Sequence, residues 1–328
     1  MERKRVVALR RLKAPHLQRL GEYFEVAYFE EPERQPEAVA AALQHAHGLI
    51  GGKLLVSPEI LDNAPALEAI ATISVGYDNI PIAELSRRGI LLTNTPDVLT
   101  ETTADTGFML IMATTRRLVE LANLVREGHW KQHIGEPLFG SDVYGKTLGL
   151  VGMGRIGQAI ARRARGFDMR VLYSNASPKP QLEDEWGILR CEFEQLLAES
   201  DFVCLTVPLT KQTEQLVGYS QCQLMKRSAF LINIARGRVV DEAGLIRALE
   251  EGLIAGAGLD VFEQEPLPTN SPLLRMNNVV TLPHIGSATR ETREAMASCA
   301  VENLCQALRG ERPHNLVNFE AWSIRYSL

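Results

Sequence analysis

Four polar side chains follow or end apolar runs in the C-terminal half of the sequence: Arg236, Asp260, Glu265 and His284. Near-continuous apolar runs of this kind are typical of parallel strands that are buried on both faces of a sheet. The carboxyl ends of such strands lie at one edge, which is where ligands bind. Each residue alone is compatible with an ordinary surface or loop position, but their common placement predicts that they converge on one site.

The types of these residues indicate the chemistry. A histidine can donate a proton near neutral pH, and a carboxylate beside it stabilises the protonated ring and fixes its tautomer. An arginine offers a rigid fork of N–H donors to a carboxylate or a polarised carbonyl. His284, Glu265 and Arg236 therefore fit the reduction of a 2-oxo acid, in which a hydride reaches the carbonyl carbon and a proton reaches its oxygen.

A glycine motif predicts where the hydride donor binds. The apolar run 148–151 is followed at once by Gly152, Gly154 and Gly157, and then by apolar residues at helical spacing. A second strand-like run closes this strand–turn–helix–strand unit within about 30 residues, the size of a dinucleotide-binding βαβ unit. The first glycine permits the tight turn, the second lets the backbone approach a pyrophosphate, and the third lets the helix pack closely. The helix N-terminus then binds the phosphate charge.

The residue that selects between the two nicotinamide cofactors is neutral. NAD-selective enzymes carry an acidic residue about 20 positions past the glycine motif, whereas this chain has Asn175 there. Ser174, Asn175 and Ser177 can donate hydrogen bonds to a 2′-phosphate, and Lys179 is near enough in sequence to add charge. NADP-preferring enzymes usually place an arginine just after this position, where this chain has Ala176. We therefore expect NADPH to be used with a modest preference, and NADH to be usable.

The composition is that of an ordinary globular protein. Of 328 residues, 35 are basic and 40 acidic, which gives a net charge of −5 and does not favour nucleic acid as a partner. No apolar run approaches the ~18 residues of a membrane span, and the N-terminus has no signal-peptide pattern. The five cysteines include no CxxC pair, so no metal site is expected. We expect a cytoplasmic protein with no membrane partner.

The alternation of strand-like and helix-like segments predicts two α/β domains. Residues 1–99 form a small parallel domain, and residues 100–288 form a Rossmann-type doubly wound parallel sheet that binds the dinucleotide. A helix over 289–309 leaves too little chain for a third core, so residues 289–328 are expected to return to the first domain. The expected fold is thus a cofactor domain inserted in a flavodoxin-like substrate domain.

The long apolar stripe between the two domains predicts one helix over 101–127, which is a natural hinge and partner surface. Trp130 lies outside any apolar period, which favours a packed loop anchor, with a subunit contact as the alternative. In the first domain, Lys53, Val75 and Gly76 lie in loops at strand ends and are candidates for contact with the substrate.

The sequence resembles the D-isomer-specific 2-hydroxyacid dehydrogenase family, and within it the glyoxylate/hydroxypyruvate and 2-ketogluconate reductases. The resemblance covers nearly the whole chain. It rests on the glycine motif together with SVGYDN at 74–79, TETTADT at 100–106, NIARG at 233–237, GLDVFEQEP at 258–266 and PHIGS at 283–287.

This resemblance implies roles for the candidate residues. It makes Arg236, Glu265 and His284 the catalytic arginine, the glutamate and the proton donor. Asp260 would hold the nicotinamide carboxamide, and the amides of Val75 and Gly76 would bind the substrate carboxylate. Family members are usually dimers built on the cofactor domain. Further positions implied in cofactor binding are Thr103, Arg155, Ile156, Val207, Pro208, Thr213, Ala235 and Gly286, and Ser287 is implied in substrate binding.

The competing class is a binding protein, because some relatives of this fold are corepressors that sense NAD(H). This chain lacks the disordered tails that such a role favours, and all three catalytic positions match. Formate dehydrogenases of this family carry a glutamine at the position of Glu265, which disfavours that activity for this chain. Phosphoglycerate dehydrogenases usually carry an extra regulatory domain, for which the chain is too short. An oxidoreductase acting on a small 2-oxo acid remains the main hypothesis.

Overall fold

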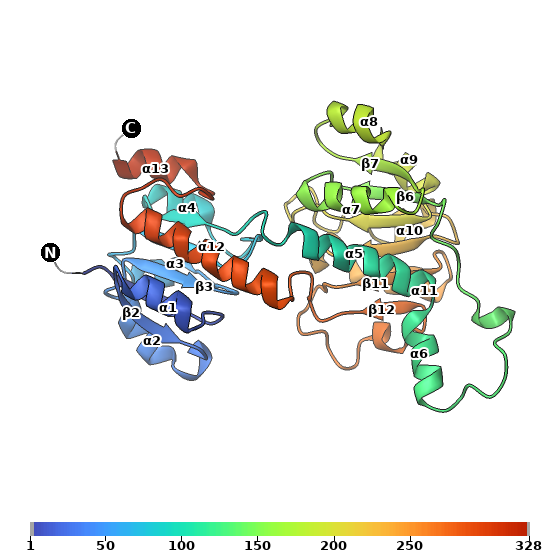
Figure 1. Cartoon of the computed structure of the whole chain (residues 1–328), viewed down its shortest axis with the longest axis horizontal. Helices are drawn as coiled ribbons and strands as arrows, with labels where there is room; N and C mark the ends of the chain where they lie inside the picture. Colours follow the sequence, from blue (N-terminus) through green and yellow to red (C-terminus); the bar gives the residue numbers. More distant parts are fainter. Residues whose placement is uncertain (1–2, 327–328) are drawn as a thin grey trace. The chain divides into compact units, whose positions relative to one another are not determined.

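The computed structural model describes residues 3–326. The chain divides into two compact units: unit 1 comprises residues 1–99 and 288–328, and unit 2 comprises residues 100–287. Each unit contains one parallel β-sheet (Figure 1). In the described part of the chain, no helix combines the length and apolar character needed to cross a membrane.

The sheet of unit 1 has the strand order β2-β1-β3-β4-β5, which is the flavodoxin-like order 2-1-3-4-5 expected from the sequence. Its strands are β1 (Arg5–Leu9), β2 (Glu25–Phe29), β3 (Gly48–Gly51), β4 (Ala69–Thr72) and β5 (Leu91–Thr93). Its helices are α1 (Ala14–Gly21), α2 (Pro36–Leu43), α3 (Pro58–Asp62), α4 (Ile82–Arg87), α12 (Arg290–Leu308) and α13 (Phe319–Tyr326).

Side-chain alternation along the strands separates the two faces of this sheet. Val7, Leu49, Ile70 and Leu92 lie opposite one another in the strand register and pack in one core cluster with residues of α2, α3 and α4. The other face carries α12, which contacts β3, β4 and β5. A side chain at Gly48 would collide with Leu308 of that helix.

The sheet of unit 2 has the order β12-β11-β10-β9-β6-β7-β8, so the first strand of the sheet along the chain, β6, is an interior strand between β9 and β7, as in a Rossmann fold. This order confirms the expected doubly wound sheet. The strands are β6 (Thr147–Val151), β7 (Arg170–Ser174), β8 (Leu189–Arg190), β9 (Phe202–Leu205), β10 (Phe230–Asn233), β11 (Gly256–Leu259) and β12 (Val279–Thr281).

Helices cover both faces of the unit 2 sheet. One core cluster joins α5 and α7 to the strands, and a second joins α9, α10 and α11 to the opposite face. The strands carry apolar side chains on both faces because each face is covered by helices. The helices are α5 (Thr100–Thr115), α6 (Leu118–Arg126), α7 (Arg155–Arg165), α8 (Pro180–Trp186), α9 (Phe193–Glu199), α10 (Tyr219–Leu224) and α11 (Glu242–Glu250).

The prediction of one helix over 101–127 is wrong, because α5 and α6 are separate. Arg117 has a left-handed backbone with φ of 52° and breaks the helix. The hydroxyls of Thr114 and Thr115 bond back to carbonyls four residues earlier, which competes with regular helix geometry. The amide of Ser141 donates to the carbonyl of Thr115, so the returning loop satisfies the end of α5.

Two short elements had no signal in the sequence. Strand β8 has only two residues, and α13 follows a loop and packs on α4. The interpretation of Trp130 as a packed loop anchor is also wrong, because 61% of its surface is exposed.

Candidate functional site

The candidate catalytic residues follow three adjacent strands of unit 2. The strands β10, β11 and β12 are parallel neighbours. Arg236 follows β10, Asp260 directly follows β11, and His284 follows β12. Since parallel strands end at a common edge, the fold brings these residues to one side of the sheet.

Asp260 holds the loop that carries the histidine. Its side chain is buried, and its two carboxylate oxygens accept hydrogen bonds from the amides of Ile285 at 2.7 Å and Gly286 at 2.8 Å. Burial raises the pKa of the Asp260 carboxyl, against these two bonds and the charge of His284, which lower it. The residue implied to bind the nicotinamide carboxamide is therefore also the clamp of the 284–286 loop.

Glu265 and His284 are in direct contact. The Nδ1 atom of His284 lies 2.8 Å from Oε2 of Glu265, and Oε1 of Glu265 accepts from the amide of Phe262 at 3.2 Å. Both side chains keep access to solvent. With Nδ1 facing the carboxylate, Nε2 is the ring nitrogen that can serve a substrate.

The backbone of His284 is left-handed, with φ of 55°. This conformation costs a non-glycine residue about 1–2 kcal/mol, and such residues persist where their surroundings fix them. Here the hydrogen bonds that the amides of Ile285 and Gly286 donate to the Asp260 carboxylate fix the loop.

The segments that carry Arg236 and Glu265 lie against each other. A Cβ atom on Gly237 would lie 1.8 Å from the carbonyl carbon of Phe262, so the backbones of these two segments are in contact. A second tie follows: the amide of Glu242 donates to Glu263 at 3.1 Å, and the amide of Glu263 donates to Glu242 at 3.2 Å. The sequence analysis did not identify this reciprocal pair, because only the folded loops bring the two residues together.

The glycine motif forms the turn between β6 and α7. Gly152 has φ of +102°, which an L side chain rarely adopts. A Cβ on Gly157 would lie 2.4 Å from the Gly152 carbonyl oxygen, so the third glycine permits close packing of the turn. Gly154, in contrast, has no atom within 4 Å of such a Cβ. This open approach, at the N-terminus of α7, fits a dinucleotide pyrophosphate.

Asn175 links the glycine turn to the end of β7. Its Oδ1 accepts from the amide of Met153 at 3.1 Å, and its Nδ2 donates to the carbonyl of Ser177 at 2.9 Å. One hydrogen of the Asn175 amide is thus engaged within the chain, and donation of the other to a 2′-phosphate stays a prediction. Arg190 on β8 donates to the carbonyl of Asn175 at 3.3 Å. This exposed arginine is a cation that the sequence analysis missed, since it lies 15 residues further along the chain.

Thr103 lies close to Gly286 and to Asp260, the residue that holds the 284–286 loop. A Cβ on Gly286 would lie 3.2 Å from Asp260 Oδ2 and 3.3 Å from Thr103 Cγ2, so the first turns of α5 reach the 284–286 loop. Arg155 and Ile156, which are also implied in cofactor binding, form the first turn of α7.

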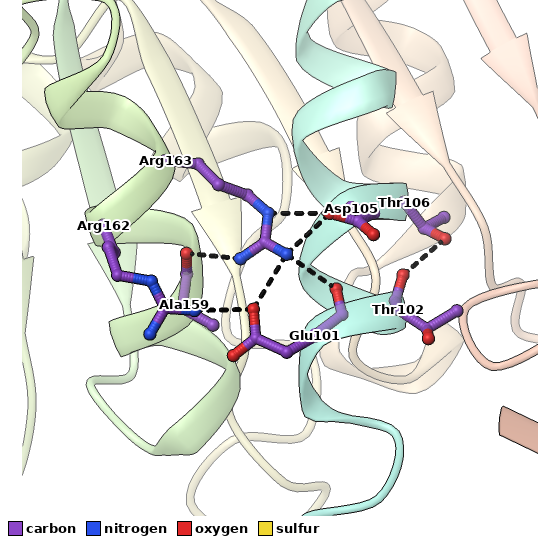
Figure 2. A network of polar contacts seen from close by, with 7 residues as sticks. All are labelled: Glu101, Thr102, Asp105, Thr106, Ala159, Arg162 and Arg163. Carbon is purple, nitrogen blue, oxygen red and sulfur yellow. Dashed lines mark hydrogen bonds and ion pairs between the residues drawn. The ribbon is translucent and has the colours of Figure 1, made fainter.

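An ionic network joins α5 to α7 (Figure 2). Arg163 on α7 contacts the Asp105 carboxylate at 2.6 Å and the Glu101 carbonyl at 3.1 Å, and Arg162 contacts the Glu101 carboxylate at 2.6 Å. The network connects the helix of the glycine motif with the helix of Thr103. It therefore fixes two segments that are both implied in cofactor binding.

The remaining implied cofactor residues lie beyond β9 and β10. Val207 Cγ1 lies 3.0 Å from the position of a Cβ on Gly152, and the hydroxyl of Thr213 donates to the carbonyl of Pro208 at 2.6 Å. Ala235 is buried and donates its amide to Asn233 Oδ1. These residues are on the carboxyl-end loops of the unit 2 sheet, as Ser287 is.

The candidate substrate residues of unit 1 follow β3 and β4. Asn94 Nδ2 donates to the carbonyl of Val75 at 2.9 Å, and Ser74 donates to the carbonyl of Gly76 at 2.6 Å. These bonds orient the peptide groups of the loop. Lys53 has a left-handed backbone with φ of 54°.

Comparison with known proteins gives a consistent result. Residues 108–286 match the family model described as D-isomer specific 2-hydroxyacid dehydrogenase, NAD binding domain. The chain is 54% identical over 304 residues to glyoxylate/hydroxypyruvate reductase B of Yersinia pestis (strain Pestoides F), covering 92% of this chain and 93% of the relative.

Solved structures agree in fold. A protein from Thermus thermophilus superposes with a TM-score of 0.86 and 44% identity, covering 95% of this chain and 99% of its own. The NADPH-dependent glyoxylate/hydroxypyruvate reductase of Sinorhizobium meliloti, in complex with NADP and malonate, has a TM-score of 0.88 and 36% identity, covering 98% of both chains.

Proposed function

The chain belongs to the D-isomer specific 2-hydroxyacid dehydrogenase family, and from this premise we propose that it reduces glyoxylate and hydroxypyruvate to the 2-hydroxy acids with NADPH. Membership makes the chain an oxidoreductase, which sets the NAD(H)-sensing binding protein aside. The observation that carries the proposal is the contact of 2.8 Å between His284 and Glu265 at the strand edge.

The proposed roles follow from this geometry. The nicotinamide cofactor, when bound, supplies the hydride to the carbonyl carbon. His284 gives a proton from Nε2 to the carbonyl oxygen, and the Glu265 carboxylate balances the charge of the protonated ring. Arg236 binds the substrate carboxylate or its carbonyl. The amides of Val75 and Gly76, Lys53 and Ser287 are the further substrate contacts that we propose.

The preference for NADPH has three supports. No carboxylate stands at the end of β7 to repel a 2′-phosphate, because the residue there is Asn175. Arg190 lies against that residue and can supply the positive charge that Ala176 does not. The S. meliloti relative named above is an NADPH-dependent reductase bound to NADP.

A panel of 2-oxo acids tests the proposal. Initial rates with NADPH should be highest for glyoxylate, hydroxypyruvate or 2-ketogluconate. Activity confined to branched apolar oxo acids would refute this choice of substrate class. The same panel with NADH measures the strictness of the cofactor preference.

A homodimer through unit 2 is the proposed assembly. Helix α6 exposes Leu118, Val119 and Val125, and the segment after it exposes Trp130 and Phe139. Figure 1 shows that this segment runs out from the rest of its unit as a long loop. Large apolar side chains gathered on such a segment are typical of a subunit contact. We also propose a cytoplasmic location, in keeping with free cysteines throughout.

A further inference from the structure

Two arginines of unit 1 have an unusual environment. Arg11 lies two residues beyond β1, and Arg293 lies in the first turn of α12. Other arginines of unit 1 are paired, as Arg10 is with Glu33 and Arg88 is with Asp62. Within residues 3–326, neither Arg11 nor Arg293 has an ion pair or a side-chain hydrogen bond. Both guanidinium groups therefore keep N–H donors from which an anion can accept hydrogen bonds.

Burial and mutual repulsion act on both charges. The pKa of Arg11 is lowered to about 10, mainly by burial and then by the charges of Arg293 and Arg10. Burial also lowers the pKa of Arg293. Arg11 nevertheless keeps an exposed surface. Arg11 is thus a solvent-accessible guanidinium that lies close enough to Arg293 for the charge of Arg293 to act on it.

The side chain of Arg11 crosses the loop that follows β3. A Cβ on Gly52 would lie 2.5 Å from Arg11 Cδ and 2.9 Å from Arg11 Nε, so only a glycine at this position allows the arginine to lie here. The next residue, Lys53, is the candidate substrate contact, and its backbone is left-handed. Arg11 therefore lies over the loop that carries Lys53, and the charge of Arg293 acts on Arg11.

The sheet order relates these cations to the Val75–Gly76 loop, whose amides are proposed to bind the substrate carboxylate. The strands β1, β3 and β4 are neighbours, and Arg11, Gly52 and the Val75–Gly76 loop follow their carboxyl ends. Adjacent strands are about 4.8 Å apart. An anion bound over Gly52 is thus separated from the Val75–Gly76 loop by about one to two strand spacings, a gap that the carbon chain of a longer oxo acid can bridge.

We propose that Arg11 and Arg293, assisted by Lys53, form an anion subsite that binds the distal carboxylate or phosphate of a longer 2-oxo acid. This inference rests on the proposed function and names a substrate class for it: 2-oxo acids with a second anionic group, in addition to glyoxylate. An arginine fork suits both anions, because it can donate two parallel hydrogen bonds.

The test compares specificity constants with NADPH for glyoxylate, 2-oxoglutarate and 3-phosphohydroxypyruvate. In Arg11→Gln and in Arg293→Gln, the ratio of kcat/KM for each dianionic acid to that for glyoxylate should fall about ten- to a hundredfold. Arg11→Lys keeps the charge without the fork and should lose less. Arg10→Gln is the matched control, since Arg10 is adjacent in sequence and paired with Glu33, and its ratios should equal those of the wild type.

The outcomes separate this inference from the proposed function. A wild-type enzyme that reduces glyoxylate but neither dianionic acid overturns the subsite alone, as do unchanged ratios in both glutamine variants. A loss for only one of the two acids identifies the anion as carboxylate or phosphate and supports the subsite. If the wild type reduces no 2-oxo acid, the proposed function fails and this inference fails with it. Thermal unfolding of each variant ensures that a loss reflects binding, and Arg11→Lys covers the case in which Arg11→Gln does not fold.

Discussion

The Nδ1 atom of His284 lies 2.8 Å from Oε2 of Glu265, although the two residues are 19 positions apart in sequence. Two loops of unit 2 create this relationship: Asp260 fixes the loop of the histidine through two amides, and backbone contact with Gly237 supports the loop of the glutamate. The histidine is therefore oriented before a substrate arrives, which is the arrangement that proton transfer requires.

We predict that His284→Ala lowers kcat for glyoxylate reduction by about two to four orders of magnitude, because the proton donor is lost. Binding of NADPH, measured by fluorescence titration, should change little, since the glycine turn is on other strands. Turnover near the wild-type rate in this variant would show that another group delivers the proton.

Glu265→Gln should lower kcat/KM for glyoxylate reduction. The amide keeps the size of the side chain but removes the carboxylate charge that balances the protonated ring of His284. The measurement is kcat/KM for glyoxylate across pH 5–9. Glu263→Gln is the matched control, because it is in the same loop and its amide oxygen can still accept from Glu242. Identical profiles for Glu265→Gln and the wild type would contradict the role assigned to this carboxylate.

Asn175→Asp should reverse the cofactor preference. The new carboxylate can keep the bond from the Met153 amide, but it repels a 2′-phosphate, so kcat/KM with NADPH should fall at least about tenfold relative to NADH. Arg190→Ala should shift the same ratio in the same direction. Arg165→Ala removes an exposed arginine from α7 and is the control. A wild type that prefers NADH more than about tenfold would contradict the proposed preference.

If the exposed apolar segment forms the dimer contact, charged substitutions on it should disrupt the dimer. In Trp130→Asp combined with Phe139→Asp, burying two charges should cost more than the contact provides, so light scattering should report the monomer mass. Leu274→Asp places one charge on an exposed apolar position outside the segment and should leave the dimer intact. A wild-type protein that is monomeric at micromolar concentration would refute this assembly.

The Glu242–Glu263 pair predicts a pH-dependent stability. Burial, and then the charge of Glu263, raise the pKa of Glu242 in the folded state. A raised pKa means that the folded chain holds the proton more tightly, so this group stabilises the fold at low pH and the contribution is lost as pH rises through the folded pKa. Glu242→Gln should therefore stabilise the protein at pH 7.5, by up to about 1 kcal/mol, and less at pH 5.

Urea denaturation of Glu242→Gln and wild type at both pH values measures this difference. Glu250→Gln, at the exposed end of the same helix, is the control. An equal gain at pH 5 and pH 7.5 would show that the effect does not come from titration of Glu242.

The sequence by itself determined the alternation of buried strands and helices in both units and the edge on which the site lies. Apolar runs and glycine spacing are local patterns, so they indicate a buried parallel strand or a dinucleotide turn without knowledge of distant residues. For the same reason, the polar residues that follow β10, β11 and β12 were identified as a group: a parallel sheet has one carboxyl edge.

Only the tertiary structure decided which side chains meet across that edge and elsewhere. Arg190 reaches Asn175 because β8 pairs with β7, and Arg11 lies over Gly52 because β1 pairs with β3. Such contacts depend on strand register and on loop paths, which the local pattern does not specify. The break at Arg117 is a further case, because the loop that satisfies the end of α5 comes from residues far beyond that turn.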